Sequence, residues 1–283
     1  MSKPLLSVII PAFNAEIYIE KCLQPLIKNL SDGLEVIVVD NGSVDKTAAI
    51  VTEGYPQVTL LKNQENLGAC RARNQAIEVS SGEWVLTLDC DVVLEDDFIL
   101  KVSQLIDDLP SDRIGIIQPK ILQADKKTID SCGIHLSWLR RFYDLGKGKT
   151  DSGQFNESIY VFGACSACAL YRRTMLEDLK ESGEYFDQKF FFLVEDVDLA
   201  WRANNRQWQS FFFPFISCCH IGKSSGFPKK FRQYLCFRNR YYTIAKNEGL
   251  GRYAGKILPV IIYDFPRLVY LALTNKYFWT RKL

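Results

Sequence analysis

Short apolar runs alternate with helical patterns along roughly the first hundred residues, and this alternation leaves the chain very few possible folds. The runs are continuous and rich in β-branched residues, which is typical of strands buried on both faces. They occupy residues 7–10, 36–39, 58–61 and 84–88. Helices are predicted between them, over residues 15–29, 45–53 and 74–80. This order predicts an α/β fold with a doubly wound, mostly parallel sheet.

The pattern continues less regularly beyond residue 97. Helices are predicted over residues 97–109 and 195–206, and strands over 114–118, 160–171 and 211–217. A chain of 283 residues can hold one large domain, or one domain with an appendage.

The predicted strands of the first part of the chain end in polar or turn residues. These segments are residues 11–14, 40–43, 66–68 and 89–91. Ligands of open α/β sheets bind beyond the carboxyl ends of the strands, so the four segments are expected to meet at one site. The glycine fingerprint of dinucleotide-binding enzymes is absent, which argues against hydride transfer.

Two carboxylates, Asp89 and Asp91, follow the apolar run at 84–88. An Asp-x-Asp pair is common in ordinary turns and by itself indicates little. Here a polar segment with a glycine and two arginines, residues 66–74, lies just upstream. Such groups at adjoining strand ends are suited to hold a divalent cation and a diphosphate.

Six segments of the chain resemble glycosyltransferase family 2, the inverting nucleotide-sugar transferases with the A-type glycosyltransferase fold. They are SVIIPAFN (7–14), VVDNGS (38–43), NLGACRARN (66–74), DCD (89–91), EDVDLAWR (195–202) and His220. The block at 195–202 and the basic, tyrosine-rich helix after it are most similar to the rhamnosyltransferase-like branch, which acts on lipid-linked or cell-surface glycans. Many members of that branch have Asn-Pro-Asp in place of residues 89–91, so UDP-sugars stay open as donors beside dTDP-rhamnose.

The resemblance implies an inverting, metal-dependent transfer of a sugar from a UDP- or dTDP-linked donor. The acceptor would be a hydroxyl of a glycan or lipid-linked saccharide in cell-surface polysaccharide synthesis. A catalytic domain is implied over residues 1–226, followed by a basic, aromatic helical segment over 227–283.

The implied donor site lies at the strand ends. Asp40 would accept the imide N–H of uracil or thymine, the turn at 11–14 would flank the base, and Gly68 would let the backbone approach the donor. Arg71 and Arg73 would lie near the nucleotide or form structural ion pairs. The donor-binding residues implied by the resemblance are Pro11, Ala12, Asn14, Asp40, Ser43, Asn66, Gly68, Arg71, Arg73, Asp89 and Lys223.

The resemblance also implies a metal and a general base. Asp91, with Asp89 and His220, would hold Mn²⁺ or Mg²⁺ on the diphosphate, and an imidazole beside carboxylates suits Mn²⁺ somewhat better. Asp196 is the predicted base, kept ionised by the start of its helix, and Glu195 is the alternative.

Charge is distributed unevenly along the chain. Residues 1–198 carry a net charge of −11 and residues 199–283 carry +13, which favours an anionic partner for the second part. Residues 227–247 are predicted to form a basic amphipathic helix, which with 257–273 would rest on an anionic membrane surface and present a polyprenyl-diphosphate-linked acceptor. The alternative is that this helix packs on the domain or forms an oligomer contact. The sequence shows no nucleic-acid-binding motif and predicts no oligomeric state.

The expected location is cytoplasmic, peripheral on the cytoplasmic face of the membrane. The cysteine count of nine is odd, the first residues lack a secretory apolar region, and no disulfide is predicted. Apolar runs are too short and interrupted to predict a membrane span.

Two other function classes stay open. A catalytically silent, nucleotide-sugar-binding scaffold would keep the strand-end motifs. A sugar nucleotidyltransferase would also use a doubly wound sheet and Mg²⁺, but it would ordinarily show a glycine-rich triphosphate loop where this chain has residues 11–14.

Overall fold

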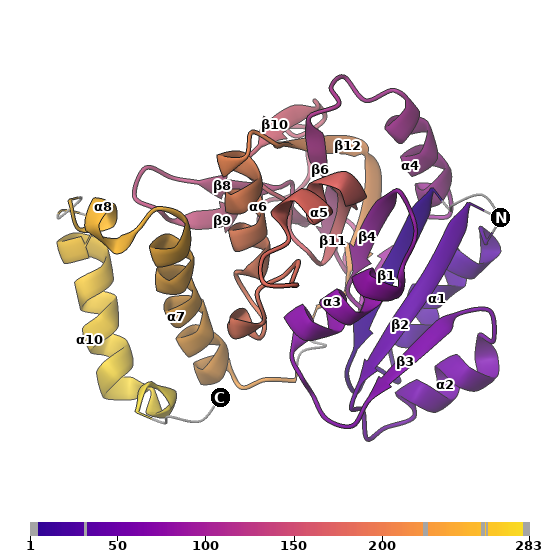
Figure 1. The fold of residues 1–283 in the computed structure, drawn as a ribbon, viewed down its shortest axis with the longest axis horizontal. Coiled ribbons are helices and arrows are strands. Elements are labelled where there is room, and N and C mark those ends of the chain that lie inside the picture. The colour runs from indigo at the N-terminus through magenta and orange to yellow at the C-terminus, as the bar shows by residue number, and fades with distance from the viewer. Residues whose placement is uncertain (1–4, 31–32, 223–225, 256–257, 259, 280–283) are drawn as a thin grey trace.

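A computed structural model describes residues 5–30, 33–222, 226–255, 258 and 260–279 (Figure 1). The strands are β1 (Leu6–Ala12), β2 (Leu34–Asn41), β3 (Thr59–Asn63), β4 (Trp84–Leu88), β5 (Val92–Leu94), β6 (Ile114–Gln123), β7 (Ile129–Ser131), β8 (Ile134–Leu136), β9 (Phe142–Asp144), β10 (Ile159–Val161), β11 (Cys168–Arg172) and β12 (Gln209–His220). The helices are α1 (Ile19–Lys28), α2 (Thr47–Gly54), α3 (Ala69–Val79), α4 (Phe98–Asp107), α5 (Arg173–Leu179), η1 (Gln188–Phe190), α6 (Glu195–Asn205), α7 (Lys229–Asn247), α8 (Leu250–Ala254), η2 (Val260–Asp264), α10 (Phe265–Thr274) and η3 (Lys276–Phe278).

One mixed sheet runs through the molecule in the order β10-β12-β6-β11-β4-β1-β2-β3, with β5 and β7 paired at its side. Strands β4, β1, β2 and β3 are parallel, as the alternating pattern predicts. The first helix begins later than predicted, at Ile19, because the amides of Ala15 and Glu16 donate to Thr47 and Asp45 instead of entering the helix.

The predicted strand over 160–171 is wrong as one element. It is two strands: β10 at the sheet edge, and β11 antiparallel between β4 and β6. Gly163, between them, lies so close to α6 that an added Cβ would be 2.4 Å from Ala200 Cβ. The intervening turn is fixed to the sheet, because Asp89 N–H donates to the Ala167 carbonyl at 2.8 Å.

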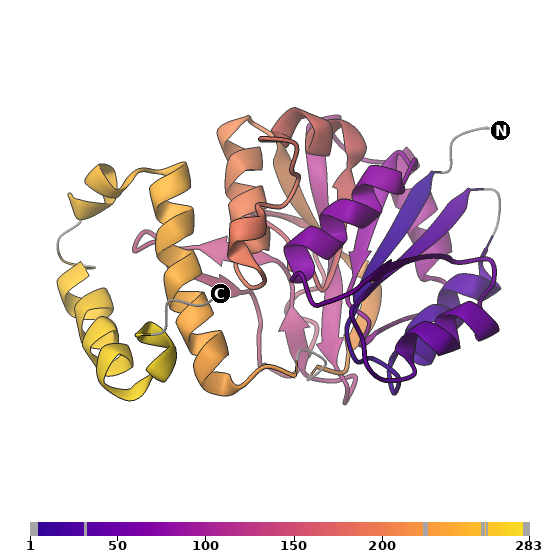
Figure 2. The same cartoon turned by 60° about the horizontal axis from the view of Figure 1, so that its bottom comes forward.

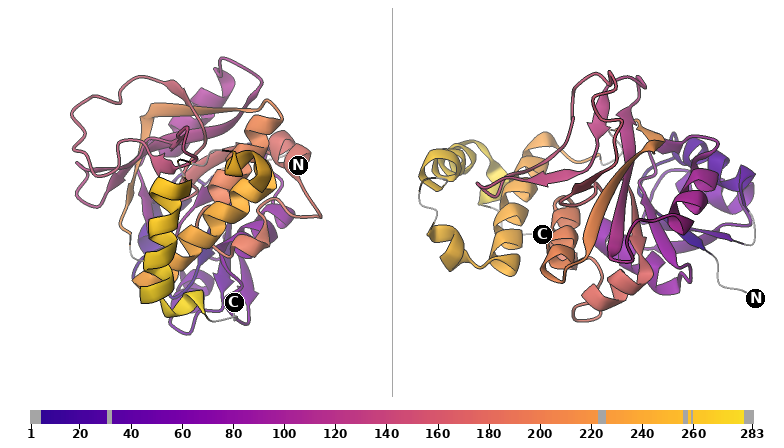
Figure 3. Two further views of the ribbon diagram at one scale, coloured as in Figure 1. Left: turned by 90° about the vertical axis from the view of Figure 1, so that its left-hand side faces the viewer. Right: turned by 90° about the horizontal axis from the view of Figure 1, so that it is seen from above.

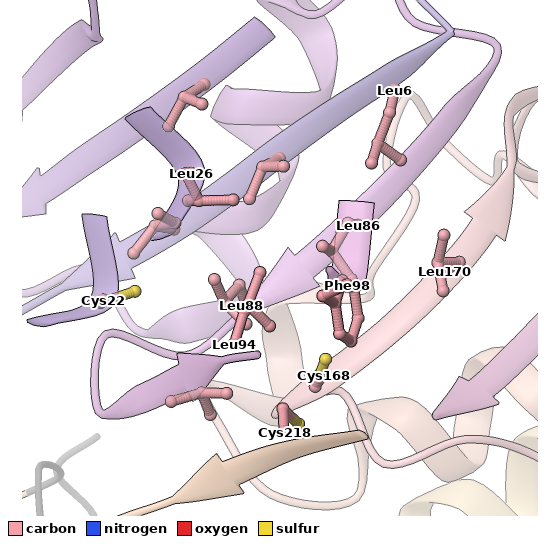
Figure 4. Packing of buried hydrophobic residues seen from close by; sticks show 14 of the residues in the cluster. Leu6, Cys22, Leu26, Leu86, Leu88, Leu94, Phe98, Cys168, Leu170 and Cys218 are labelled. Carbon is pink, nitrogen blue, oxygen red and sulfur yellow. The ribbon is translucent and has the colours of Figure 1, made fainter. Parts of the chain in front are cut away.

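Two apolar layers cover the sheet. Helices α1, α2 and α4 pack on one face, and α3, α5 and α6 pack on the other. Successive residues of β1 alternate between the layers: Val8 and Ile10 join the first and Ile9 the second. Figure 4 shows the first layer, where Cys22, Leu26 and Phe98 from the helices meet strand residues such as Leu86. All nine cysteines of the chain are free thiols.

The helices at the end of the chain lie beside this domain. Figures 1 and 2 show α7 between α6 and α10, and Figure 3 shows α7 and α10 side by side. The predicted helix over 227–247 is confirmed as α7. The buried face of α7 packs on the domain, as the alternative prediction for this helix has it. One basic residue of α7 forms ion pairs with the domain, since Nζ of Lys246 lies 3.0 Å from Asp187 and 3.1 Å from Asp198. The predicted division at residue 226 stays a prediction.

No helix in the described part of the chain is long and apolar enough to cross a membrane.

Candidate functional site

A cavity of about 460 Å³ opens at the carboxyl ends of the parallel strands. The residues singled out from the sequence that line it are Pro11, Ala12, Asn66, Gly68, Arg73, Asp89, Asp91, Glu195, Asp196 and His220. Strand ends, the start of α6 and the end of β12 thus meet at one place, as expected for an open α/β sheet.

Three of these residues form a candidate metal centre. The ligand atoms of Asp89, Asp91 and His220 all lie within 4.8 Å of one another. Strand β12 runs antiparallel to β5 with His220 opposite Val92, which brings the imidazole to the Asp-x-Asp turn. Nε2 of His220 is 3.3 Å from Oδ1 of Asp91. Two carboxylates and an imidazole are a donor set that fits Mn²⁺ or Mg²⁺, with the nitrogen favouring Mn²⁺.

Asp130 holds the imidazole in this orientation. It lies in β7, and its Oδ2 is 2.8 Å from Nδ1 of His220. Its Oδ1 is 3.3 Å from Nζ of Lys147, which also contacts Asp144 at 3.0 Å. Although burial opposes protonation, the hydrogen bonds to Asp130 and Asp91 raise the pKa of His220 to about 10. A metal would displace the proton from Nε2, while the carboxylate of Asp130 keeps the proton on Nδ1 and so makes Nε2 the ligand atom.

Arg73 is buried between two carboxylates of the site. Its guanidinium lies 2.8 Å from Asp89 and 2.5 Å from Glu195. Of the two roles left open for Arg73, the structure shows the structural ion pair. Burial opposes its charge, but the two carboxylates outweigh that effect and raise the pKa of Arg73. The oxygen of Glu195 that makes this pair is Oε1.

Asp196 lies at the start of α6, next to Glu195. Its carboxylate accepts Val197 N–H at 2.8 Å and Ser166 N–H at 3.4 Å. The helix start was predicted to keep this group ionised; the amides of Val197 and Ser166 do lower its pKa, but stronger effects outweigh them. Burial, followed by the nearby charges of Glu195 and Asp144, raises its pKa to about 7. A carboxylate with this pKa can take up a proton near neutral pH.

The segment before Asp196 has an unusual backbone. Phe191, Leu193 and Val194 have φ values of 66°, 68° and 76°, which non-glycine residues rarely adopt. Asn239 of α7 holds the segment, since its Nδ2 donates to the carbonyls of Phe192 at 3.0 Å and Leu193 at 2.7 Å. Helix α7 therefore helps to place the start of α6.

Gly68 packs against the same segment. Its φ is +86°, and an added Cβ would be 2.5 Å from Cδ2 of Phe191. The loop before it is held by Asn41, whose Nδ2 donates to Oδ1 of Asn66 at 3.0 Å and to the Gly68 carbonyl at 3.2 Å. Asn66 thus has a structural role, and a side chain at position 68 would displace the phenylalanine.

Several predicted donor-binding residues do not line the cavity. Asp40 accepts Ser43 N–H at 3.2 Å, and Oγ of Ser43 accepts Asn14 N–H at 2.9 Å, so these three residues join the ends of β1 and β2 beside Pro11 and Ala12. Arg71 is exposed and reaches Gln188. Lys223 lies outside the described residues.

The sequence reasoning missed several lining residues that belong to no motif. Asp130, Asp144 and Ser166 are examples, and so are Phe191, Phe192 and Phe227, which we call the aromatic wall. The rings of Phe192 and Phe227 stack with centroids 5.0 Å apart. These residues come from five separate parts of the chain, and only folding brings them together.

A sequence model described as glycosyl transferase family 2 matches residues 7–180, which is more than half of the chain. The chain belongs to glycosyl transferase family 2. EpsH of Bacillus subtilis (strain 168) is 28% identical to this chain over 199 residues. The match covers 68% of this chain and 55% of EpsH, whose own assignment as a glycosyltransferase is inferred. An N-acetylglucosaminyltransferase of Rhizobium sp. (strain N33) is 29% identical over 193 residues, covering 64% of the chain and 40% of that protein. The chain thus spans about half the length of these relatives.

Solved structures show the same fold. A mannosyltransferase of Pyrobaculum calidifontis, PcManGT, in complex with GDP-Man and Mn²⁺, matches with a TM-score of 0.60 at 20% identity, covering 87% of this family 2 chain and 64% of that one. GalNAc-T7 with UDP, GalNAc and Mn²⁺ matches with a TM-score of 0.63 at 13% identity, covering 86% and 48%. At these identities the likeness concerns the fold alone, and it confirms the predicted A-type glycosyltransferase fold.

Proposed function

We propose that this family 2 chain is an inverting glycosyltransferase that uses a nucleotide-diphospho-sugar and a divalent metal. The observation that carries the proposal is the cavity itself, where a metal-type donor set and a carboxylate with a raised pKa face the same space. Inverting transfer requires these two groups: one that offsets charge on the leaving group, and one that accepts the proton of the attacking hydroxyl.

Asp89, Asp91 and His220 would hold the metal, Mn²⁺ or Mg²⁺. Once bound, the metal would offset the charge that develops on the nucleoside-diphosphate leaving group. The Mn²⁺ in the PcManGT and GalNAc-T7 structures supports this part of the proposal. Pro11 and Ala12 would contact a UDP- or dTDP-linked donor, with its base extending toward Asp40.

Asp196 would act as the general base. The amides of Val197 and Ser166 hold its carboxylate in place, while Glu195 is occupied by Arg73. Asp196 would take the proton from the acceptor hydroxyl as that oxygen attacks the anomeric carbon. The bond to the diphosphate breaks on the opposite face, so one displacement inverts the configuration.

The acceptor would be a glycan or a polyprenyl-diphosphate-linked saccharide in cell-surface polysaccharide synthesis. The aromatic wall supports an acceptor with an apolar part, and Arg232, exposed at the cavity, would contact its phosphates. The rhamnosyltransferase-like branch stays a narrower hypothesis within this proposal, because neither relative named above is described by that activity.

Thermal unfolding with nucleotides tests the donor and metal parts. UDP, dTDP, GDP and CDP are each compared with and without Mn²⁺, and we expect one nucleotide to raise the melting temperature only when metal is present. No rise with any nucleotide, in folded protein, would contradict the proposal.

Asp196→Asn separates catalysis from binding. We expect this variant to keep the nucleotide-dependent stabilisation. Its transfer rate, measured as release of the nucleoside diphosphate, should fall at least about a hundredfold. Asp96→Asn is the matched control, because the Asp96 side chain is 84% exposed and outside the cavity. A scaffold protein would bind nucleotide and show no transfer even in the parent chain.

A further inference from the structure

The last helices of the chain leave an apolar surface uncovered. Of the 19 exposed large hydrophobic side chains among the described residues, nine fall between residues 258 and 279. The C-terminal apolar face is defined here by Ile261, Ile262, Phe265, Val269, Leu273 and Trp279. Contiguous apolar patches of this kind mark interaction sites, whereas single exposed apolar residues need no explanation.

This face is one side of an amphipathic segment. Residues 262, 265, 269 and 273 follow one another at intervals of three or four, so they share a side of the helix. Leu273 is 81% exposed and Ile262 is 72% exposed, while Leu271 is 2% exposed and faces inward. One side of the segment is thus buried, and the apolar side chains of the other side are exposed to solvent.

The exposed charges of the described residues from 226 to 279, the segment that carries this face, have one sign. Glu248 and Asp264 are the only acidic residues after Asp198. Both are used internally: Glu248 lies 2.6 Å from Arg140, and Asp264, 2% exposed, lies 2.5 Å from Arg240. The cations of this segment that remain exposed are Lys229, Lys230, Arg232, Arg252 and Lys276.

We propose that the C-terminal apolar face lies in the interfacial region of an anionic phospholipid bilayer. No helix of the described residues is both long and apolar enough to span a bilayer. An apolar face on a segment whose exposed charges are all cations, with Trp279 74% exposed near its end, is suited to lie at the headgroup level. A second copy of the chain fits less well, because pairing two such faces would bring their cations together.

The same segment is continuous with the cavity. The ring of Phe227, in the aromatic wall, is tilted against the ring of Phe231 in α7, with centroids 5.2 Å apart. The ring of Phe231 in turn contacts that of Tyr277 in η3, with centroids 5.1 Å apart. Docking this face would hold the aromatic wall close to the bilayer, where a lipid-linked acceptor would lie. This last step rests on the proposed function; binding of the face to lipid does not.

Vesicle flotation tests the proposal on the full chain. We expect the chain to float with vesicles of phosphatidylcholine and phosphatidylglycerol at low salt. With phosphatidylcholine alone the bound fraction should fall at least about tenfold, and added salt should weaken binding. For the variant Ile262→Asp with Leu273→Asp, the fraction bound to anionic vesicles should be at least about tenfold lower than for the parent chain.

The matched control is Val44→Asp with Leu100→Asp. These side chains are 91% and 59% exposed and lie outside the C-terminal segment, so this variant makes the same change in charge and apolar area elsewhere. It should float like the parent chain. Both variants should keep the parent melting temperature and its shift with nucleotide, which shows that lost flotation is not lost folding.

Three outcomes would overturn the proposal. The parent chain fails to float with anionic vesicles, or the variant Ile262→Asp with Leu273→Asp binds them as the parent chain does. Alternatively, gel filtration shows a concentration-dependent dimer that only the C-terminal variant splits, with no flotation, which would assign the face to a second copy. Because flotation needs no turnover, failure of the transfer assay would leave the lipid proposal standing.

Discussion

Asp130 shows how a single side chain outside any motif sets the chemistry of this site. It lies 90 positions before His220 in the chain and yet holds Nδ1 of that imidazole at 2.8 Å. Without it, the imidazole could rotate or change tautomer, and Nε2 would no longer be directed at the carboxylates. The orientation of one predicted ligand therefore depends on a residue that sequence reasoning did not select.

Asp130→Asn tests this dependence. An amide in place of the carboxylate should weaken Mn²⁺ binding by about tenfold to a hundredfold, because the imidazole loses its fixed tautomer. Titration calorimetry or Mn²⁺ electron paramagnetic resonance measures the affinity directly. Asp96→Asn should bind Mn²⁺ like the parent chain, and equal affinity in Asp130→Asn would show that Asp130 does not orient the ligand.

Asp196 should give stability a dependence on pH. Its pKa is raised to about 7 by burial and by neighbouring carboxylates, whereas an unfolded Asp titrates near about 4. The folded state thus binds more protons between these values, and the contribution of Asp196 to the free energy of unfolding falls as pH rises from about 4 to 7. Transfer should instead rise over the upper part of this range and level off above about pH 7, because the base must be ionised.

Urea unfolding at about pH 5 and about pH 8 checks the stability part. Between these conditions the parent chain should lose stability relative to Asp196→Asn, which cannot titrate at this position. The exposed Asp96→Asn variant should follow the parent chain. Parallel behaviour of Asp196→Asn and the parent would mean that the pKa of Asp196 is not raised.

At the scale of elements, the site depends on the contact of α7 with the segment before α6. Asn239 is fully buried, and its amide satisfies the carbonyls of Phe192 and Leu193 where the backbone has positive φ values. Positive φ at bulky residues is unfavourable by about 1–3 kcal/mol each and persists only where the surroundings enforce it. Helix α7 therefore helps to build the candidate site, and it precedes the segment proposed to lie on the membrane.

Asn239→Asp keeps the shape of this side chain but replaces a donor by an acceptor that faces carbonyl oxygens. We expect a loss of about 1–3 kcal/mol in the free energy of unfolding, since buried polar groups would lose their partners. Transfer should fall while the nucleotide-dependent thermal shift remains, because Asp196 is displaced and the metal ligands are not. Gln233→Glu, a half-buried amide-to-acid change on the same helix, is the control and should have a much smaller effect.

At the scale of the whole molecule, a buried ion pair attaches the last helices to the rest. Arg240 of α7 lies 2.5 Å from Asp264, at the start of α10, and also donates to the carbonyls of Leu139 and Arg140. One guanidinium thereby joins three parts of the chain that are distant in sequence. Burial opposes its charge, but Asp264 together with Tyr253 and Tyr241 outweighs burial and raises the pKa of Arg240.

Asp264→Ala would leave Arg240 buried and without its carboxylate. Removing one partner of a buried pair typically costs about 3–5 kcal/mol, so α10 should open locally and its amides should exchange faster with solvent. Hydrogen exchange read by mass spectrometry would show this in residues 265–274 while β1 and β4 stay protected. The control is Asp97→Ala, which breaks the exposed ion pair with Lys101 and should have little effect on hydrogen exchange. If the amides of α10 in Asp264→Ala exchange as slowly as in the parent chain, the ion pair does not attach the last helices.

The sequence by itself determined the parallel half of the sheet, β1 to β4, and the family. Continuous apolar runs and polar strand ends are local signals, and the parallel arrangement makes their ends meet wherever such strands form. Asp89 and Asp91 could be selected for the same reason, His220 and Asp196 were selected through the family resemblance, and all four are found at one cavity. The roles of these residues stay predictions until the variants are measured.

Tertiary structure alone decided the rest. The split of residues 160–171 is accompanied by close packing of Gly163 on Ala200, the ion pair of Arg73 depends on α6, and the pKa of Asp196 depends most on burial. None of these contacts is between neighbours in sequence, so no local pattern encodes them. Burial, packing distance and the sum of nearby charges are properties of the folded chain, and they turn a set of motif residues into a site with a defined chemistry.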